Sequence, residues 1–163
     1  MTTNKPLTTP CVGLCSTVFG DSVCRGCMRF VHEVIDWNRY NDEHKQLVWQ
    51  RLDEQLWVIL PQIVRIYDPR KIIAIVQHLH IAHDEHNIWR CVYDLIRANE
   101  KRHLTLDNCG FKLNNKWQLK DINEHLYLLA TAYYQKDFLR AAGTVSLNVK
   151  EEKDESGQLP LSL

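Results

Sequence analysis

Four cysteines lie within seventeen residues near the N-terminus, in two closely spaced pairs, Cys11-x3-Cys15 and Cys24-x2-Cys27. Two thiolates separated by two or three residues can bind one metal without straining the backbone. Two such pairs complete a ligand set of four sulfurs, which structural zinc sites and iron–sulfur clusters both use. The spacing therefore predicts that Cys11, Cys15, Cys24 and Cys27 hold a metal.

The identity of that metal is left open by the cysteines. Two pairs separated by a spacer are typical of zinc sites, while the closely repeated cysteines of ferredoxins are absent and no proline follows Cys27. We therefore expect Zn²⁺, with an iron–sulfur cluster as the alternative. Disulfides are a weaker interpretation, because Cys91 and Cys109 stand alone far downstream and the first residues lack the apolar run of a signal peptide. We expect Cys91 to be buried and Cys109 to be exposed.

The metal is also expected to fold its own loop. Residues 11–27 contain few apolar side chains apart from the cysteines, so burial alone stabilises this segment weakly. Arg25 and Arg29 flank the second pair. They are either hydrogen-bond donors that offset the negative charge of the thiolates or solvated surface residues.

The pattern of the whole chain predicts a mainly α-helical protein of 163 residues. Residues 1–10 are expected to be a disordered N-terminus, and residues 11–60 a four-cysteine metal-binding module that leads into a helical hairpin. Residues 61–148 are expected to form a further helical segment packed on that module. Residues 149–163 have the charged and Ser-, Gly- and Pro-containing composition of a disordered tail.

Apolar residues at helical spacing predict the individual helices. A first helix is expected over residues 25–37, with the second cysteine pair at its N-terminus. Asn41 or Asp42 is expected to cap a second helix, which Pro61 ends. Further helices are expected over residues 72–79, 84–102 and 119–142, with a short hairpin over residues 103–118.

A weaker signal is a cluster of four histidines, His78, His80, His83 and His86. The pair His83-Asp84 is similar to paired ligands of helical metal-dependent phosphohydrolases, so a hydrolase site is a third and weak hypothesis. A polar helix end explains the same residues more simply. No catalytic residue is predicted, because the chain contains no phosphate-binding loop, nucleophile elbow or paired-carboxylate spacing.

Charge and hydropathy limit the partners. Twenty basic and twenty acidic residues cancel, so there is no general attraction to nucleic acid or to an anionic membrane. No stretch approaches the roughly 20 apolar residues that span a bilayer. We expect a cytoplasmic protein. Trp49 and Trp57 would lie on one broad side of their helix, either as part of the core or as a surface for a protein partner.

Residues 9–52 resemble a known family. The segments Cys11-Val12-Gly13-Leu14-Cys15 and Cys24-Arg25-Gly26-Cys27-Met28-Arg29, followed by Glu33-Val34, Trp37 and Asp42-Glu43, are similar to the small bacterial YdhL-like family of predicted iron–sulfur proteins. Its members usually have Thr where this chain has Phe30. The resemblance implies a metal site at the four cysteines and no activity. Together, these observations predict a non-enzymatic metal-binding protein that acts through contact with another protein. The alternative is an iron–sulfur protein that transfers electrons or senses redox state.

Overall fold

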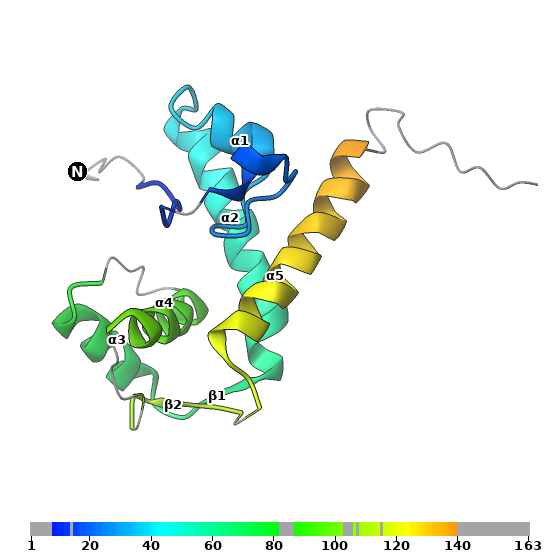
Figure 1. Cartoon of the computed structure of the whole chain (residues 1–163). Helices are drawn as coiled ribbons and strands as arrows, with labels where there is room; N and C mark the ends of the chain where they lie inside the picture. The colour runs from blue at the N-terminus through cyan, green and yellow to red at the C-terminus, as the bar shows by residue number, and fades with distance from the viewer. Residues whose placement is uncertain are drawn as a thin grey trace, which may run out of the picture.

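The computed structural model describes residues 8–13, 15–81, 87–102, 106, 108–114 and 116–139, and these form a mainly α-helical fold, as predicted. Two long antiparallel helices, α2 (Asp42–Ile59) and α5 (Leu119–Tyr134), lie side by side and form its centre (Figure 1). Because α2 runs the length of the molecule, it contacts both the N-terminal segment and the helices that follow it.

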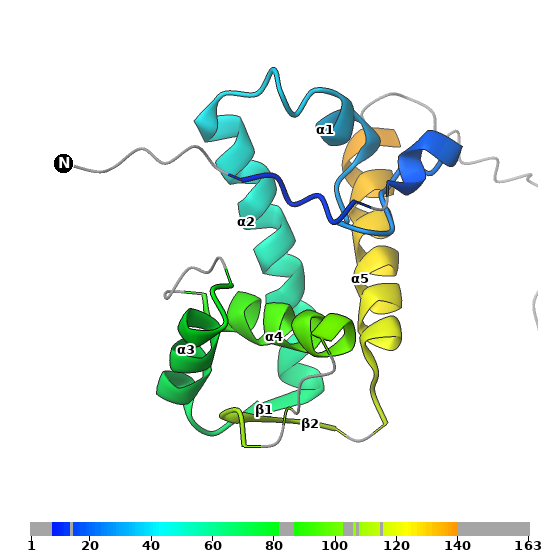
Figure 2. The same ribbon diagram turned by 60° about the vertical axis from the view of Figure 1, so that its left-hand side comes forward.

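The remaining elements gather at the two ends of this helix pair. The cysteine segment, with the 3₁₀ turn η1 (Ser16–Phe19) and the short helix α1 (Val31–Ile35), lies at one end. Helix α4 (Ile88–Arg102) crosses α2 and contacts α3 (Pro69–His78), as Figure 2 shows. The 3₁₀ turn η2 (Leu60–Gln62) and the π-helical turn η3 (Gln135–Leu139) extend α2 and α5.

Capping residues fix the starts of two helices, at the predicted place for α2 and three residues before the expected start for α3. The Asn41 side chain accepts a hydrogen bond from the His44 N–H at 2.9 Å, which fixes the start of α2. Helix α2 ends at Ile59, before Pro61, as expected. The Asp68 carboxylate caps α3 in the same way through the Lys71 N–H at 3.1 Å.

The helix predicted over residues 25–37 is wrong for its first half. Residues 22–31 form a tight hairpin, in which Val23 pairs with Phe30 and the Cys24 N–H donates to the Arg29 carbonyl at 2.8 Å. Met28 adopts a left-handed backbone conformation with φ of +59°, which a helix cannot contain. The second cysteine pair therefore lies in this hairpin, and helix α1 begins only at Val31.

A two-stranded ribbon closes the other end of the molecule. Strand β1 (Val64–Ile66) pairs antiparallel with β2 (Phe111–Leu113). The local hairpin predicted over residues 103–118 is therefore wrong, because β2 pairs with a strand that precedes two helices. Cys109 is buried rather than exposed, since it lies two residues before Phe111, the core residue that begins β2. Cys91 is buried, as predicted.

One hydrophobic core runs through both ends of the fold. It contains apolar side chains from the cysteine hairpin, from α2 to α5 and from the β-ribbon. Its most deeply buried members are Val23, Leu56, Leu60, Ile72, Val76, Cys91, Val92, Leu95, Ile122, Leu126 and Ala130. The cysteine segment is thus attached to the helical body by shared burial, in addition to anything that a metal contributes.

Some predictions fall on residues outside the described parts of the chain. These are the disorder of residues 1–7 and 149–163, the start of the predicted helix over residues 84–102, and the last residues of the helix over 119–142. Within the described residues, no helix combines the length and the apolar character needed to cross a bilayer.

The close approach of Gly110 to the start of α3 gives a test of the fold. A Cβ atom at Gly110 would lie 2.3 Å from the Asp68 carbonyl oxygen, so Gly110→Ala should lower the free energy of unfolding by about 3 kcal/mol. Gly20 has a similar φ of +96° but open space around it, and Gly20→Ala should cost only about 1 kcal/mol. Denaturant unfolding measures both values. Equal losses would contradict the packing of Gly110 on Asp68.

Candidate metal centre

The second cysteine pair is held by the backbone of the hairpin. The Met28 N–H donates to the Cys24 carbonyl at 2.8 Å, which closes the turn that carries Cys24 and Cys27. Both cysteines are buried. The Cys27 thiol lies within hydrogen-bonding reach of the Cys24 sulfur. The hairpin thus brings two candidate ligands together before any metal is bound.

The Cys24 sulfur is surrounded by backbone donors. Burial acts to raise the pKa of Cys24, but the N–H groups of Ser16, Cys27 and Gly26 all donate to its sulfur, and the net pKa lies below the ordinary value of a thiol. Donors of this kind stabilise the thiolate, which is the form that binds a metal. The Ser16 donor comes from the residue next to Cys15, so the loop of the first pair already touches the second.

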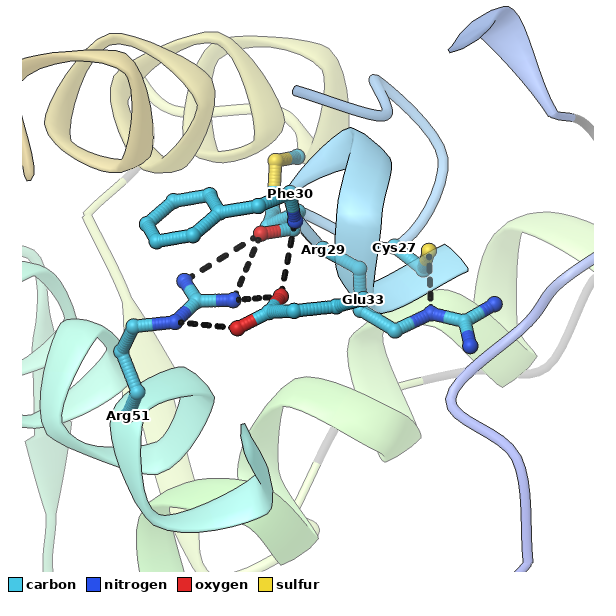
Figure 3. A network of polar contacts seen from close by, with 6 residues as sticks. Cys27, Arg29, Phe30, Glu33 and Arg51 are labelled. Carbon is cyan, nitrogen blue, oxygen red and sulfur yellow. Dashed lines mark hydrogen bonds and ion pairs between the residues drawn. The ribbon is translucent and has the colours of Figure 1, made fainter. Parts of the chain in front are cut away.

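Cys27 has a side-chain donor as well. The Arg29 Nε–H donates to the Cys27 sulfur at 3.3 Å, as Figure 3 shows. Burial raises the pKa of the Cys27 thiol, and the hydrogen bond and positive charge of Arg29 oppose that rise. Of the two buried thiols, Cys24 is therefore the easier to deprotonate.

Arg29 is the least expected residue of the site. Its side chain is only 3% exposed, its guanidinium lies over the Trp37 ring at 4.8 Å, and no described carboxylate pairs with it. One of its terminal nitrogens, Nη1, is buried without a hydrogen-bond partner in the described part of the chain. Arg25, by contrast, is exposed and pairs with Asp21 at 3.1 Å. The two arginines that the sequence left undecided therefore differ: Arg25 is a surface residue, and Arg29 is a buried donor to a cysteine.

The first cysteine pair is less enclosed. Cys11 is exposed, and its sulfur accepts a hydrogen bond from the Gly13 N–H at 3.4 Å. Cys15 is half-buried, with its sulfur 3.0 Å from the Thr17 hydroxyl. Among the described residues, no three His, Cys, Asp or Glu side chains are grouped closely enough to hold a metal ion. The structure therefore brings Cys24 and Cys27 together, and the joining of Cys11 and Cys15 to them stays a prediction.

The donor set nevertheless fits a metal bound by thiolates. A buried guanidinium without an acidic partner is costly, because the low-dielectric interior replaces the water that solvated its charge. A site of four thiolates around one divalent metal carries a formal charge of about −2. The described contacts of Arg29 are a sulfur and the Trp37 ring, with no carboxylate, so an anionic sulfur centre at Cys27 would offset its charge.

A buried ion pair fastens this hairpin to α2, and sequence reasoning missed it. Arg51 reaches from α2 to Glu33 of α1, with Nη2 2.6 Å from Oε2 and Nε 3.3 Å from Oε1. The same guanidinium donates to the Met28 carbonyl at 3.3 Å and lies over the Phe30 ring at 3.9 Å (Figure 3). Glu33 also accepts from the Phe30 N–H at 2.7 Å. The sequence does contain a signal for the role of Glu33. A glutamate three residues after the first, capping residue of a helix often accepts a hydrogen bond from the N–H of that residue, here Phe30.

The histidine cluster receives no support. His83 and His86 lie outside the described residues, and His80 is exposed, with Nδ1 3.0 Å from the His78 carbonyl oxygen. The described part of this segment therefore neither assembles nor excludes a second metal site.

Comparison with known proteins identifies a similar family for part of the chain. Residues 9–56 match the model of a family described as "Protein of unknown function (DUF1289)". The matched segment contains the four cysteines, Arg29 and the Glu33–Arg51 pair. It is an uncharacterised cysteine-rich family, so the match is compatible with metal binding and carries no activity. The naming as a YdhL-like iron–sulfur protein stays a prediction. No curated protein and no solved structure matches the chain.

The Arg51–Glu33 pair gives a test of how the hairpin is attached. Arg51→Met should lower the free energy of unfolding by about 3–5 kcal/mol, because the Glu33 carboxylate would stay buried without a cation. Arg39→Met removes an arginine from the exposed Asp36 pair and should change the free energy by less than about 0.5 kcal/mol. Chemical denaturation of both variants measures the difference. The double change Arg51→Met and Glu33→Gln should cost less than the sum of its parts, and strict additivity would rule out a direct interaction.

Proposed function

We propose that Cys11, Cys15, Cys24 and Cys27 bind one metal ion, with Zn²⁺ favoured, and that the metal-bound segment serves contact with a protein partner rather than catalysis. The observation that carries this proposal is Arg29, a buried cation whose described hydrogen bond goes to the Cys27 sulfur. The N–H donors around Cys24 support it, because they favour the deprotonated form that a metal needs. The metal, when bound, supplies cross-links within the loop and no chemistry of its own.

A partner-binding role is supported by the surface of the metal loop. Val18 and Phe19, in the turn η1 between the two cysteine pairs, are large apolar residues, and Phe19 is 89% exposed. Exposed aromatic side chains beside a rigid loop are typical of protein contact sites. A cytoplasmic location belongs to the same proposal, because thiolates that bind a metal stay reduced there.

An iron–sulfur cluster is the second candidate. Hydrogen bonds from backbone N–H groups and from an arginine to cysteine sulfurs tune the reduction potential of a cluster, and Cys24 and Cys27 receive such bonds. The role would then be electron transfer or redox sensing. The same four cysteines would be the ligands, so the two candidates differ in the metal and not in the site.

Metal analysis with a visible spectrum, on full-length protein purified without oxygen, tests the proposal. One zinc per chain and no colour is the expected result, while iron with sulfide and visible absorption would replace zinc by a cluster. Cys24→Ser and Cys27→Ser should each remove most of the metal. Cys91→Ala, which changes a buried cysteine outside the motif, should leave the metal content unchanged. Protein without any bound metal, or cysteine variants that retain it, would overturn the site.

The role of Arg29 is tested by a matched pair of arginines. Arg29→Met should raise the dissociation constant for zinc at least about tenfold, because residues that hydrogen-bond metal ligands contribute on that scale. Arg25→Met, which changes the exposed arginine of the same motif, should leave that constant nearly unchanged. Competition with a chromophoric chelator measures both. In metal-free protein, Arg29→Met should not lower the melting temperature, since it removes a buried charge. Equal zinc affinities in both variants would contradict the proposed pairing of Arg29 with a metal thiolate.

A further inference from the structure

A groove of about 1080 Å³ lies between the cysteine segment and the helical body. Its walls are residues 8–12, residues 26–28 of the hairpin, one face of α2 and the facing side of α4. In Figure 2 the segment that begins at residue 8 runs across α2 on one side of this region, and α4 crosses α2 on the other. The Trp49 Nε1–H donates to the Thr8 carbonyl at 3.0 Å and holds the first wall in place. The groove is therefore a built feature, and no function described above uses it.

A buried amide lines the groove. Gln55 of α2 is 1% exposed, and neither its Nε2 nor its Oε1 has a hydrogen-bond partner among the described residues. An amide buried without partners is strongly unfavourable, so such groups in folded proteins normally meet a ligand or ordered water. Gln55 offers one donor group and one acceptor side by side. A peptide group carries the complementary acceptor and donor.

The charge of the groove favours one kind of ligand. Five acidic side chains line it, against two arginines, Arg90 and Arg97. Asp94 pairs with Arg97 at 3.9 Å, and burial raises the pKa of its carboxyl against the effect of both arginines. Asp53 is paired with Arg90 at 2.7 Å. Asp42, Glu43 and Glu54 are exposed, and Glu54 accepts a hydrogen bond from the Gln50 amide. The acidic residues are Asp42, Glu43, Asp53, Glu54 and Asp94.

The groove also has the apolar and amide groups that an extended chain needs. Trp57, which is 55% exposed, lines it and provides an aromatic face for a cationic side chain. The Trp49 and Tyr93 rings already lie against Arg90 and Arg97. Gln46 and Gln50 add two exposed side-chain amides from α2, and the Gln50 amide donates to the Glu54 carboxylate at 3.0 Å. An acidic wall repels the phosphates of a nucleic acid. These features together select a peptide that carries Lys or Arg.

We propose that this groove binds an extended, basic segment of a partner protein, with the Gln55 amide pairing to a peptide group and the acidic rim contacting Lys or Arg. This proposal states which kind of partner the function proposed above would involve. It rests on that function in one respect only: Cys11 and Cys27 line the groove, and metal-bound thiolates there would add negative charge. The carboxylates and Gln55 act without the metal.

Two pools of blocked peptides of equal length provide the test, one enriched in Lys and Arg and the other in Asp and Glu, each titrated into the full-length protein. The basic pool should bind in a fluorescence anisotropy assay, and the nuclear magnetic resonance signals of the Gln55 side-chain NH₂ group and the Arg90 Nε–H should shift. The acidic pool should do neither. Binding of the acidic pool, or of neither pool, would overturn the proposal.

Matched variants locate the binding. Gln55→Met should weaken the basic pool about tenfold, because it removes both hydrogen-bonding atoms, while the melting temperature stays equal or rises. Gln62→Met, at an exposed glutamine outside the groove, should change neither. Glu43→Gln and Glu54→Gln should each weaken binding about twofold to fivefold, and Glu124→Gln on α5 should not. A lower melting temperature for Gln55→Met with unchanged peptide affinity would mean that ordered water satisfies the amide, and would refute its role.

The metal content of the same samples separates the two proposals. Protein that lacks metal but binds the basic pool with a Gln55 signal shift supports the groove and refutes the metal site. Protein with one zinc that binds neither pool refutes the groove and leaves the metal site standing.

Discussion

A half-buried guanidinium, that of Arg51, joins the cysteine hairpin to the helical body. Arg51 is the point where the hairpin, α1 and α2 meet, because it donates both to a Glu33 carboxylate and to the Met28 carbonyl. A buried ion pair is favourable only when its remaining donors and acceptors are satisfied. Here the Phe30 N–H completes the carboxylate and the Phe30 ring covers the guanidinium. The hairpin residue Phe30 therefore covers the ion pair that attaches the hairpin to α2.

This arrangement fixes more than the position of the hairpin. Met28 has a left-handed backbone, which costs about 1 kcal/mol for a residue other than glycine, and its carbonyl is the one that Arg51 binds. The strained residue directly follows Cys27. The interaction that holds the hairpin on α2 thus also holds the turn in which the two buried sulfurs face each other. A long-range ion pair therefore adds to the local hydrogen bonds that hold this turn.

The sequence predicts the elements whose signals are local and misses those that depend on distant contacts. Asn41 is a capping residue that acts within one helical turn, so the start of α2 follows from it. Asp68 caps α3 in the same way, three residues before the start that apolar spacing alone predicts. The apolar residues after Cys24 have helical spacing, but the hydrogen bond between Cys24 and Arg29 and the long-range contact of Arg51 favour a hairpin there. The pairing of β1 with β2 joins strands on either side of two helices, and no local pattern encodes it.

The candidate site shows the same division. The spacing of the cysteines identifies the sulfurs, because chelation by neighbouring residues is a local property. It cannot distinguish Arg25 from Arg29, which are four residues apart and of the same type, yet one is exposed and the other buried. That difference arises because Arg29 extends toward Trp37 and Cys27 within the hairpin. Which arginine donates to a cysteine sulfur depends on the fold, which the spacing of the residues alone does not determine.

Arg29 and Gln55 have buried polar atoms without a hydrogen-bond partner among the described residues. The two side chains call for different kinds of partner. Arg29 bears a charge, so its burial calls for an anion, and the nearest group that can supply one is Cys27. Gln55 is neutral, so its burial calls only for hydrogen-bond partners. Residues 26–28 of the hairpin belong to both regions, because they include the candidate ligand Cys27 and also form a wall of the groove. A metal at the sulfurs and a peptide in the groove would therefore act on the same backbone, and by linkage each would change the affinity for the other by the same factor.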